Sequence, residues 1–169
     1  RGLKLRKVWV NAIVDDAITV ATTGLANNAS VASTSTGNNS TDGTQVFNQS
    51  GGTVTLPAET FAPGSQANYT TTVACTGATL SGSTPGSTFT MPENDVTCTY
   101  TNTRKTVTLQ LKKTWINAQL GDAVTVTAAG ITNSAGAALN AVADTASETD
   151  PGTVVTVYAG EVATLNEGA

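Results

Sequence analysis

Apolar and polar residues alternate along short stretches of this chain, and an alternation with a period of two is typical of β-strands. In the first stretch the alternation puts Lys7 on the same face as Leu5 and Trp9. Further stretches of this kind, separated by turn residues, predict strands near 3–10, 17–23, 44–48, 52–56, 66–75, 87–91 and 95–103. Many short strands of this spacing predict an all-β fold with the architecture of a Greek-key β-sandwich.

The segment 26–43 lacks this alternation. It is polar and low in complexity, so it predicts either a long surface loop or a pair of weakly marked edge strands. Its fragment GNNSTDG (37–43) is rich in oxygen ligands but lacks the downstream bidentate Glu of a calcium loop, so we expect a plain turn there. No metal or cofactor is expected anywhere in the chain.

The pattern of the first strands recurs later in the chain. KVWVNAIVDDAITVATTGLAN (7–27) aligns without a gap with KTWINAQLGDAVTVTAAGITN (113–133), and Trp9 and Trp115 are 106 residues apart. Self-similarity over such a length is the signature of tandem repeats. Both tryptophans are expected to anchor a core.

The second copy of the pattern stops early. GGTVTLPAE (51–59) matches AGEVATLNE (159–167) with a small insertion, but nothing follows that corresponds to the remainder of the first copy. We expect a complete sandwich repeat at 1–105 and a second repeat at 106–169 that is either truncated or completed by another chain. Because the chain opens on Arg1 without a signal peptide, an excerpt from a longer array is the favoured explanation.

Composition narrows the classes of function. Charged residues make up only 12%, histidine is absent and the net charge is −4. A chain without a basic surface is a poor partner for nucleic acid, and no apolar run approaches the length of a membrane span. With no credible catalytic base or paired-carboxylate site, the sequence does not predict an enzyme.

The chain contains two cysteines, Cys75 and Cys98, and both are predicted to point inward from strands that flank a turn-rich segment. An even count in such a chain favours a disulfide and an oxidising compartment, because a catalytic thiol would need a histidine partner. A disulfide closing a loop of this size contributes roughly 3 kcal/mol.

The inward position of Lys7 and its counterpart Lys113 is unusual. A buried, unpaired ammonium costs several kcal/mol, so each lysine needs a partner. The last predicted strand of the first repeat carries an amide, Asn102, on its otherwise apolar face.

A carboxylate is the other candidate partner of each lysine. Glu59 follows the strand at 52–56, and Glu167 occupies the matching place in the second repeat. The spacings differ by one residue, and a bulge at Pro57 would restore the same facing.

These residues together resemble the collagen-adhesin B-type and SpaA-like pilin modules, which have a prealbumin-like (transthyretin-like) sandwich. The resemblance rests on the Lys-x-Trp of the first strand, a central Glu and the Asn of the closing Y-T-N-T strand. It implies that Lys7 and Asn102 condense into an intramolecular isopeptide bond promoted by Glu59, with Lys113 and Glu167 as the matching pair. Burial favours the neutral, nucleophilic amine and a protonated carboxyl able to polarise the amide.

Two other interpretations of these groups stay open. Lys7 can form an ion pair with Glu59 without any bond to Asn102. Asp16 and Asp122, which precede the second strand of each repeat, are further candidate acids, although their place at a strand end favours a turn role.

The sequence therefore predicts a structural repeat of a bacterial adhesin stalk or surface fibre, located outside the cell. Its partners would be neighbouring repeats or like subunits, or a host or matrix surface. One alternative is a filament subunit completed by strand exchange. Another is a binding module that recognises a glycan or host protein through the segments 26–43 and 132–153, whose sequences differ strongly. The disulfide and the absence of an L-P-x-T-G sorting motif depart from the pattern of pilin modules.

Overall fold

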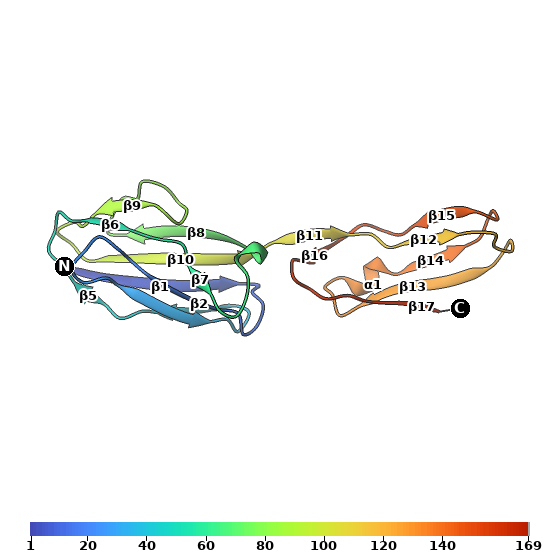
Figure 1. Ribbon diagram of the computed structural model, residues 1–169, viewed down its shortest axis with the longest axis horizontal. Coiled ribbons are helices and arrows are strands. Elements are labelled where there is room, and N and C mark those ends of the chain that lie inside the picture. Colours follow the sequence, from blue (N-terminus) through green and yellow to red (C-terminus); the bar gives the residue numbers. More distant parts are fainter. Residues whose placement is uncertain (169) are drawn as a thin grey trace. The chain divides into compact units, whose positions relative to one another are not determined.

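The computed structural model describes residues 1–168, and the chain divides into two compact units between Arg104 and Lys105. Both units consist almost entirely of β-strands, as the ribbon in Figure 1 shows. The prediction of an all-β sandwich is confirmed. No helix among the described residues has the length and apolarity needed to cross a membrane.

The first sheet of unit 1 contains its longest strands. Its order is β4 (Asn39–Asp42), β1 (Gly2–Val10), β10 (Val96–Arg104) and β8 (Tyr69–Thr76), and β5 (Val46–Phe47) also pairs with β1. The first and last strands, β1 and β10, run parallel, whereas the other pairs are antiparallel. The two parallel strands therefore lie side by side in the sheet, where they bring the two ends of the unit's sequence together.

The opposite layer of unit 1 consists of shorter strands. One sheet has the order β3 (Ser30–Thr34), β2 (Ala17–Ala21) and β7 (Thr60–Phe61), and a second sheet pairs β6 (Thr53–Thr55) with β9 (Thr88–Thr90). A 3₁₀ turn, η1 (Gln66–Asn68), leads into β8. Alternate side chains from both layers meet in one apolar core, among them Leu3, Leu5, Trp9, Ile18, Val54, Phe89 and Tyr100. Burying such side chains is the main driving force for this fold.

The segment 26–43 forms strands β3 and β4, so the second of its two predicted interpretations holds. The expected bulge at Pro57 is wrong: β6 ends at Thr55, residues 56–59 belong to no strand, and pairing resumes in the other sheet at β7. Because Pro57 has no amide hydrogen, the chain can cross between sheets there without losing a ladder bond.

Unit 2 repeats part of this arrangement. β11 (Thr106–Leu109) and β12 (Lys112–Trp115) pair with β16 (Val155–Tyr158) and β15 (Glu148–Pro151). The other sheet has the order β14 (Leu139–Val142), β13 (Ala123–Ala129) and β17 (Thr164–Gly168), and a short helix, α1 (Ser134–Ala137), precedes β14. The turns after the two tryptophan strands also match, since Asn11 and Asn117 both have a φ of 52°.

The disulfide between Cys75 and Cys98 is present. The two residues lie directly opposite each other on β8 and β10, with their Cα atoms 4.0 Å apart. The bridge therefore joins two strands that are already hydrogen-bonded neighbours.

Candidate functional site

The site of interest is the inner face of β1, where the sequence places a lysine among apolar residues. The Lys7 side chain is completely buried. Its neighbours on the same face, Leu5 and Trp9, are buried as well. The Lys7 Nζ lies 4.5 Å from the centroid of the Trp9 ring, which is within the range of a cation–π contact.

Glu59 neutralises this lysine. Lys7 Nζ donates a hydrogen bond of 2.6 Å to Glu59 Oε1, and both side chains have an exposed fraction of 0%. Glu59 comes from the segment 56–59, which connects the two sheets of the opposite layer and lies immediately before β7. Burial lowers the pKa of Lys7 to about 8, although the charge of Glu59 and its hydrogen bond oppose that change. A substantial neutral fraction of the amine is therefore present near pH 8.

Asn102 is the amide that the sequence predicted on the same face. It lies on β10 opposite Trp9, and it is completely buried. Thr71 Oγ1 donates a hydrogen bond of 2.6 Å to Asn102 Oδ1, and Gln66 Nε2 donates one of 2.8 Å to Thr71 Oγ1. Sequence analysis did not identify Thr71 or Gln66, although Thr71 shares the inward face of its strand with Tyr69 and Val73.

Two buried polar atoms of these residues lack a hydrogen-bond partner within the described part of the chain, namely Glu59 Oε2 and Asn102 Nδ2. Burying such atoms without partners is costly, so native structures contain few of them. The two atoms belong to residues of the same core, which marks Lys7, Glu59 and Asn102 as its unusual members.

Tyr100 closes the cluster on the β10 side. It lies opposite Lys7 in the parallel pair, and its hydroxyl donates a hydrogen bond of 2.9 Å to the Pro57 carbonyl. Burial, together with the nearby charge of Glu59, raises the pKa of Tyr100 well above its usual range. Tyr100 therefore stays a neutral donor that fixes the segment carrying Glu59.

The corresponding pair in unit 2 is more open. Lys113 Nζ donates a hydrogen bond of 2.8 Å to Glu167 Oε1 and lies 4.7 Å from the centroid of the Trp115 ring. Its contacts thus repeat those of Lys7. However, the exposed fractions of the two side chains are 19% and 50%.

The two further candidate acids belong to other contacts. Tyr69 donates a hydrogen bond of 2.5 Å from its hydroxyl to Asp16 Oδ2 and accepts one of 3.0 Å from the Ile13 N–H. Burial and the contact with Asp16 raise the pKa of Tyr69 to about 12. Asp122 Oδ2 accepts from the Gln119 N–H at 3.1 Å. Each aspartate therefore holds the turn before its strand.

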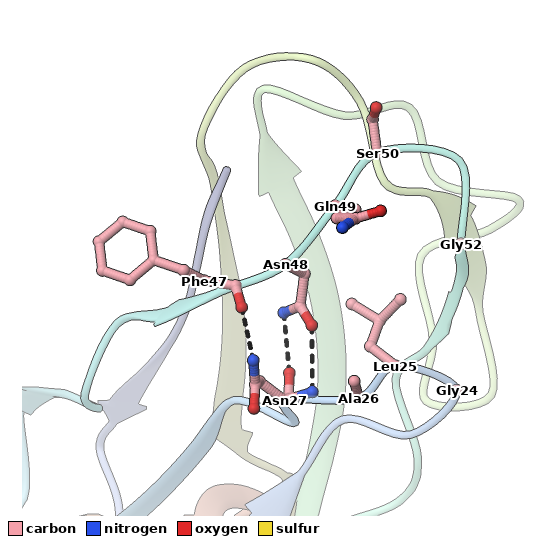
Figure 2. A pocket seen from close by; sticks show the side chains of 9 residues that line it. All are labelled: Gly24, Leu25, Ala26, Asn27, Phe47, Asn48, Gln49, Ser50 and Gly52. Atoms are coloured by element: carbon pink, nitrogen blue, oxygen red, sulfur yellow. Dashed lines mark hydrogen bonds between the residues drawn. The ribbon is translucent and has the colours of Figure 1, made fainter.

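A surface pocket lies beside the start of the 26–43 segment, and Figure 2 shows its lining. Asn48 accepts from the Asn27 N–H and donates to the Asn27 carbonyl, at 3.1 and 2.8 Å. Asn27 Nδ2 donates to the Phe47 carbonyl at 2.7 Å. The Phe47 ring points away from the pocket in Figure 2. The amides here hold two loops together, which leaves few groups to recognise a ligand.

Within residues 1–168 no cluster of His, Cys, Asp or Glu side chains could hold a metal ion. No protein-family model, curated protein or solved structure matches the chain.

Proposed function

We propose that this chain is a structural module of a bacterial extracellular stalk or fibre, and that unit 1 forms a covalent bond between Lys7 and Asn102. The observation that carries the proposal is the fully buried Lys7–Glu59 pair on β1, together with the fully buried Asn102 on the neighbouring strand β10. A buried ion pair is seldom more stable than the apolar residues that could replace it. Retaining one in a small core is therefore better explained by chemistry than by stability alone.

The reaction is a single condensation within the chain. The neutral Lys7 amine attacks the Asn102 side-chain carbonyl carbon, the new C–N bond forms, and the bond to Asn102 Nδ2 breaks. Glu59 moves a proton from Lys7 Nζ to the departing nitrogen, which leaves as ammonia, so atoms and charge balance. The lowered pKa of Lys7 supports this role, because a neutral amine is the nucleophile. The step occurs once and is not turnover.

Other features of the chain suit a spacer. The low content of charged residues and the disulfide that joins β8 to β10 favour a durable module outside the cell over a regulated intracellular one. About half of the residues in the segments 26–43 and 132–153, which a binding module would use as loops, lie in strands or in α1. Binding to a panel of glycans by the purified chain would contradict the spacer role.

The filament alternative requires a neighbour that donates strands. The strands that unit 2 would need correspond to β8 and β10 of unit 1, and in unit 1 both are already paired within the first sheet. A folded copy therefore has no such strand to spare among its described residues, and we favour the stalk module. Polymers of the purified chain in electron micrographs, with a matching shift on a sizing column, would reverse that preference.

Intact-mass measurement of the reduced chain tests the bond. We expect a mass lower than the sequence mass by one ammonia, and an uncleaved link between the peptides that carry Lys7 and Asn102 after digestion. The variant Asn102→Ala should show its full sequence mass, whereas Lys113→Met in unit 2 should still lose ammonia. A full mass for the unaltered chain would leave the Lys7–Glu59 contact as an ion pair only.

A further inference from the structure

Thr71 of β8 and Asn102 of β10 are inward-facing polar side chains that lie directly opposite each other in the first sheet of unit 1. Asn102 is completely buried, and Thr71 has an exposed fraction of 9%. The inward residues on either side of Thr71, Tyr69 and Val73, are buried as well. Water therefore has little access to this contact, and a hydrogen bond in such surroundings is electrostatically stronger than one at the surface.

The hydrogen bonds at Thr71 fix the direction of its single hydroxyl proton. Gln66 Nε2 donates to Thr71 Oγ1 at 2.8 Å, and an amide nitrogen can only donate. The Thr71 hydroxyl therefore accepts from Gln66 and gives its own proton to Asn102 Oδ1, which is 2.6 Å away. The hydrogen bond from Gln66 also polarises the hydroxyl, which makes Thr71 a better donor to Asn102.

The 3₁₀ turn η1, which precedes β8, places Gln66 within reach of Thr71. Ser65 caps this turn by accepting a hydrogen bond from the Ala67 N–H, and the Tyr69 N–H donates to the Gln66 carbonyl. The chain therefore folds back on itself between Gln66 and Thr71, which are five positions apart. Gln66 itself is exposed, so it can be replaced without a change in the core.

The side-chain amide of Asn102 is held at its oxygen and not at its nitrogen. Asn102 Oδ1 accepts from Thr71, whereas Asn102 Nδ2 has no hydrogen-bond partner in the part of the chain that the structure describes. Attack on the amide carbon moves an electron pair onto Oδ1, and that pair returns as Nδ2 leaves. A donor already directed at the oxygen stabilises the charge that develops there, and the departing nitrogen has no hydrogen bond to lose.

We infer that Thr71 is a catalytic residue of the condensation between Lys7 and Asn102, because its hydroxyl stabilises the oxyanion that forms at Asn102 Oδ1. Gln66 is the positioning residue that orients this hydroxyl. The inference rests on the proposed function. Thr71 keeps its proton throughout, so the departing ammonia takes two hydrogens from Asn102 Nδ2 and one from Lys7 Nζ. A threonine that only satisfied a buried oxygen would affect stability but not the rate of ammonia loss.

Timed refolding tests the role of Thr71. The full chain is isolated unfolded from inclusion bodies, its full starting mass is verified, and it is refolded by dilution and quenched in acid at intervals. Intact mass gives the fraction that has lost ammonia, and tryptophan fluorescence reports folding separately. Thr71→Val keeps the shape of the side chain without the hydroxyl and should slow the loss about 100- to 1000-fold. Thr71→Ser should recover most of the rate, and Thr72→Val, on the outward face of β8, should react like the unaltered chain.

Gln66→Glu tests the direction of the hydroxyl without a change in the core. A carboxylate at position 66 accepts the Thr71 proton and so removes the donor from Asn102, and the loss of ammonia should slow as it does for Thr71→Val. Asn68→Asp, which places the same charge in the same turn, should not slow it.

The outcomes separate this inference from the proposed function. Ammonia loss at the unaltered rate from folded Thr71→Val or from Gln66→Glu would overturn the role of Thr71 and leave the bond itself in place. If Thr71→Val does not fold, Gln66→Glu decides alone. An unaltered chain that folds without losing ammonia would overturn the proposed bond, and the role of Thr71 with it.

Discussion

Units 1 and 2 place the same three side chains, a lysine, a tryptophan and a glutamate, in two different surroundings. The hydrogen bonds from lysine to glutamate are nearly equal, at 2.6 and 2.8 Å, and each ammonium lies over its tryptophan ring. What differs is the cover: the first pair is fully buried and the second is partly open to water. Contact geometry alone therefore does not determine what an ion pair contributes.

The cover in unit 1 comes from the β8–β10 half of its first sheet. Tyr100 lies opposite Lys7, and Asn102 follows on the same face. Removing water from the pair raises the cost of its charges and makes neutralisation of Lys7 easier. A lysine–glutamate pair is therefore a partly exposed contact in unit 2, whereas in unit 1, where β8 and β10 cover it, it is a candidate reaction centre.

The largest expected effect is the removal of Glu59. Glu59→Ala leaves the Lys7 ammonium buried without its partner, and breaking a buried pair in this way costs about 3–5 kcal/mol. Chemical denaturation followed by tryptophan fluorescence should show the loss. Glu93→Ala, which removes an exposed partner of Arg1 in the same unit, is the matched control and should change the free energy of unfolding little. Equal effects of the two variants would contradict the distinction between buried and exposed pairs.

Loss of the disulfide should come next. The double variant Cys75→Ser, Cys98→Ser removes a bridge between residues separated by 23 positions. Restoring the freedom of that loop in the unfolded chain lowers the free energy of unfolding by roughly 3 kcal/mol. The change should be confined to unit 1, so hydrogen exchange in β13 and β14 should stay the same. Faster exchange in both units would mean that they unfold together.

The lowered pKa of Lys7 should make unit 1 more stable as the pH rises, provided that the amine is free. In an Asn102→Ala background the folded state binds fewer protons than the unfolded state between pH 8 and 10.5, so stability increases in that window. From pH 7 to 9.5 we expect a gain of about 2 kcal/mol by chemical denaturation. Above pH 10 the raised pKa values of Tyr69 and Tyr100 should reverse the trend. A flat profile would contradict burial of a titrating amine, and Lys7→Met in this background should give one.

The smallest effect belongs to the counterpart pair. Glu167→Ala removes a partly exposed ion pair in unit 2, and such pairs contribute about 0–1 kcal/mol. The difference between Glu59→Ala and Glu167→Ala is the direct measure of what β8 and β10 add. A large loss for Glu167→Ala would show that the Lys113 pair is desolvated in solution.

Alternation in the sequence was sufficient to locate the long strands and to orient Lys7 and Asn102 inward, because each lies in a run with a clear apolar face. It left β3 and β4 as one of two interpretations, because their Ser, Thr and Asn residues carry little contrast between faces, and it missed the two-residue β7. Pairing in these strands is decided by neighbours distant in the chain, which a local pattern does not record.

The sequence was sufficient to predict which residues form the candidate site, but not the hydrogen bonds that hold them. The role of Glu59 as the partner of Lys7 followed from the need to neutralise a buried ammonium. The hydrogen bonds from Thr71 to Asn102 and from Tyr100 to Pro57 depend on the register of β8, β10 and the crossing segment. Register is a property of the assembled sheet, so no single strand encodes it.

The parallel pairing of β1 and β10 has a mechanical consequence. The chain enters unit 1 at the start of β1 and leaves it at the end of β10, so these two points lie at opposite ends of the pair. A pull on them loads the eight paired positions from Leu3–Val96 to Val10–Thr103 in shear, and the hydrogen bonds between the strands share the load instead of opening one after another. A cross-link between Lys7 and Asn102 would join these same two strands and stop them from sliding past each other.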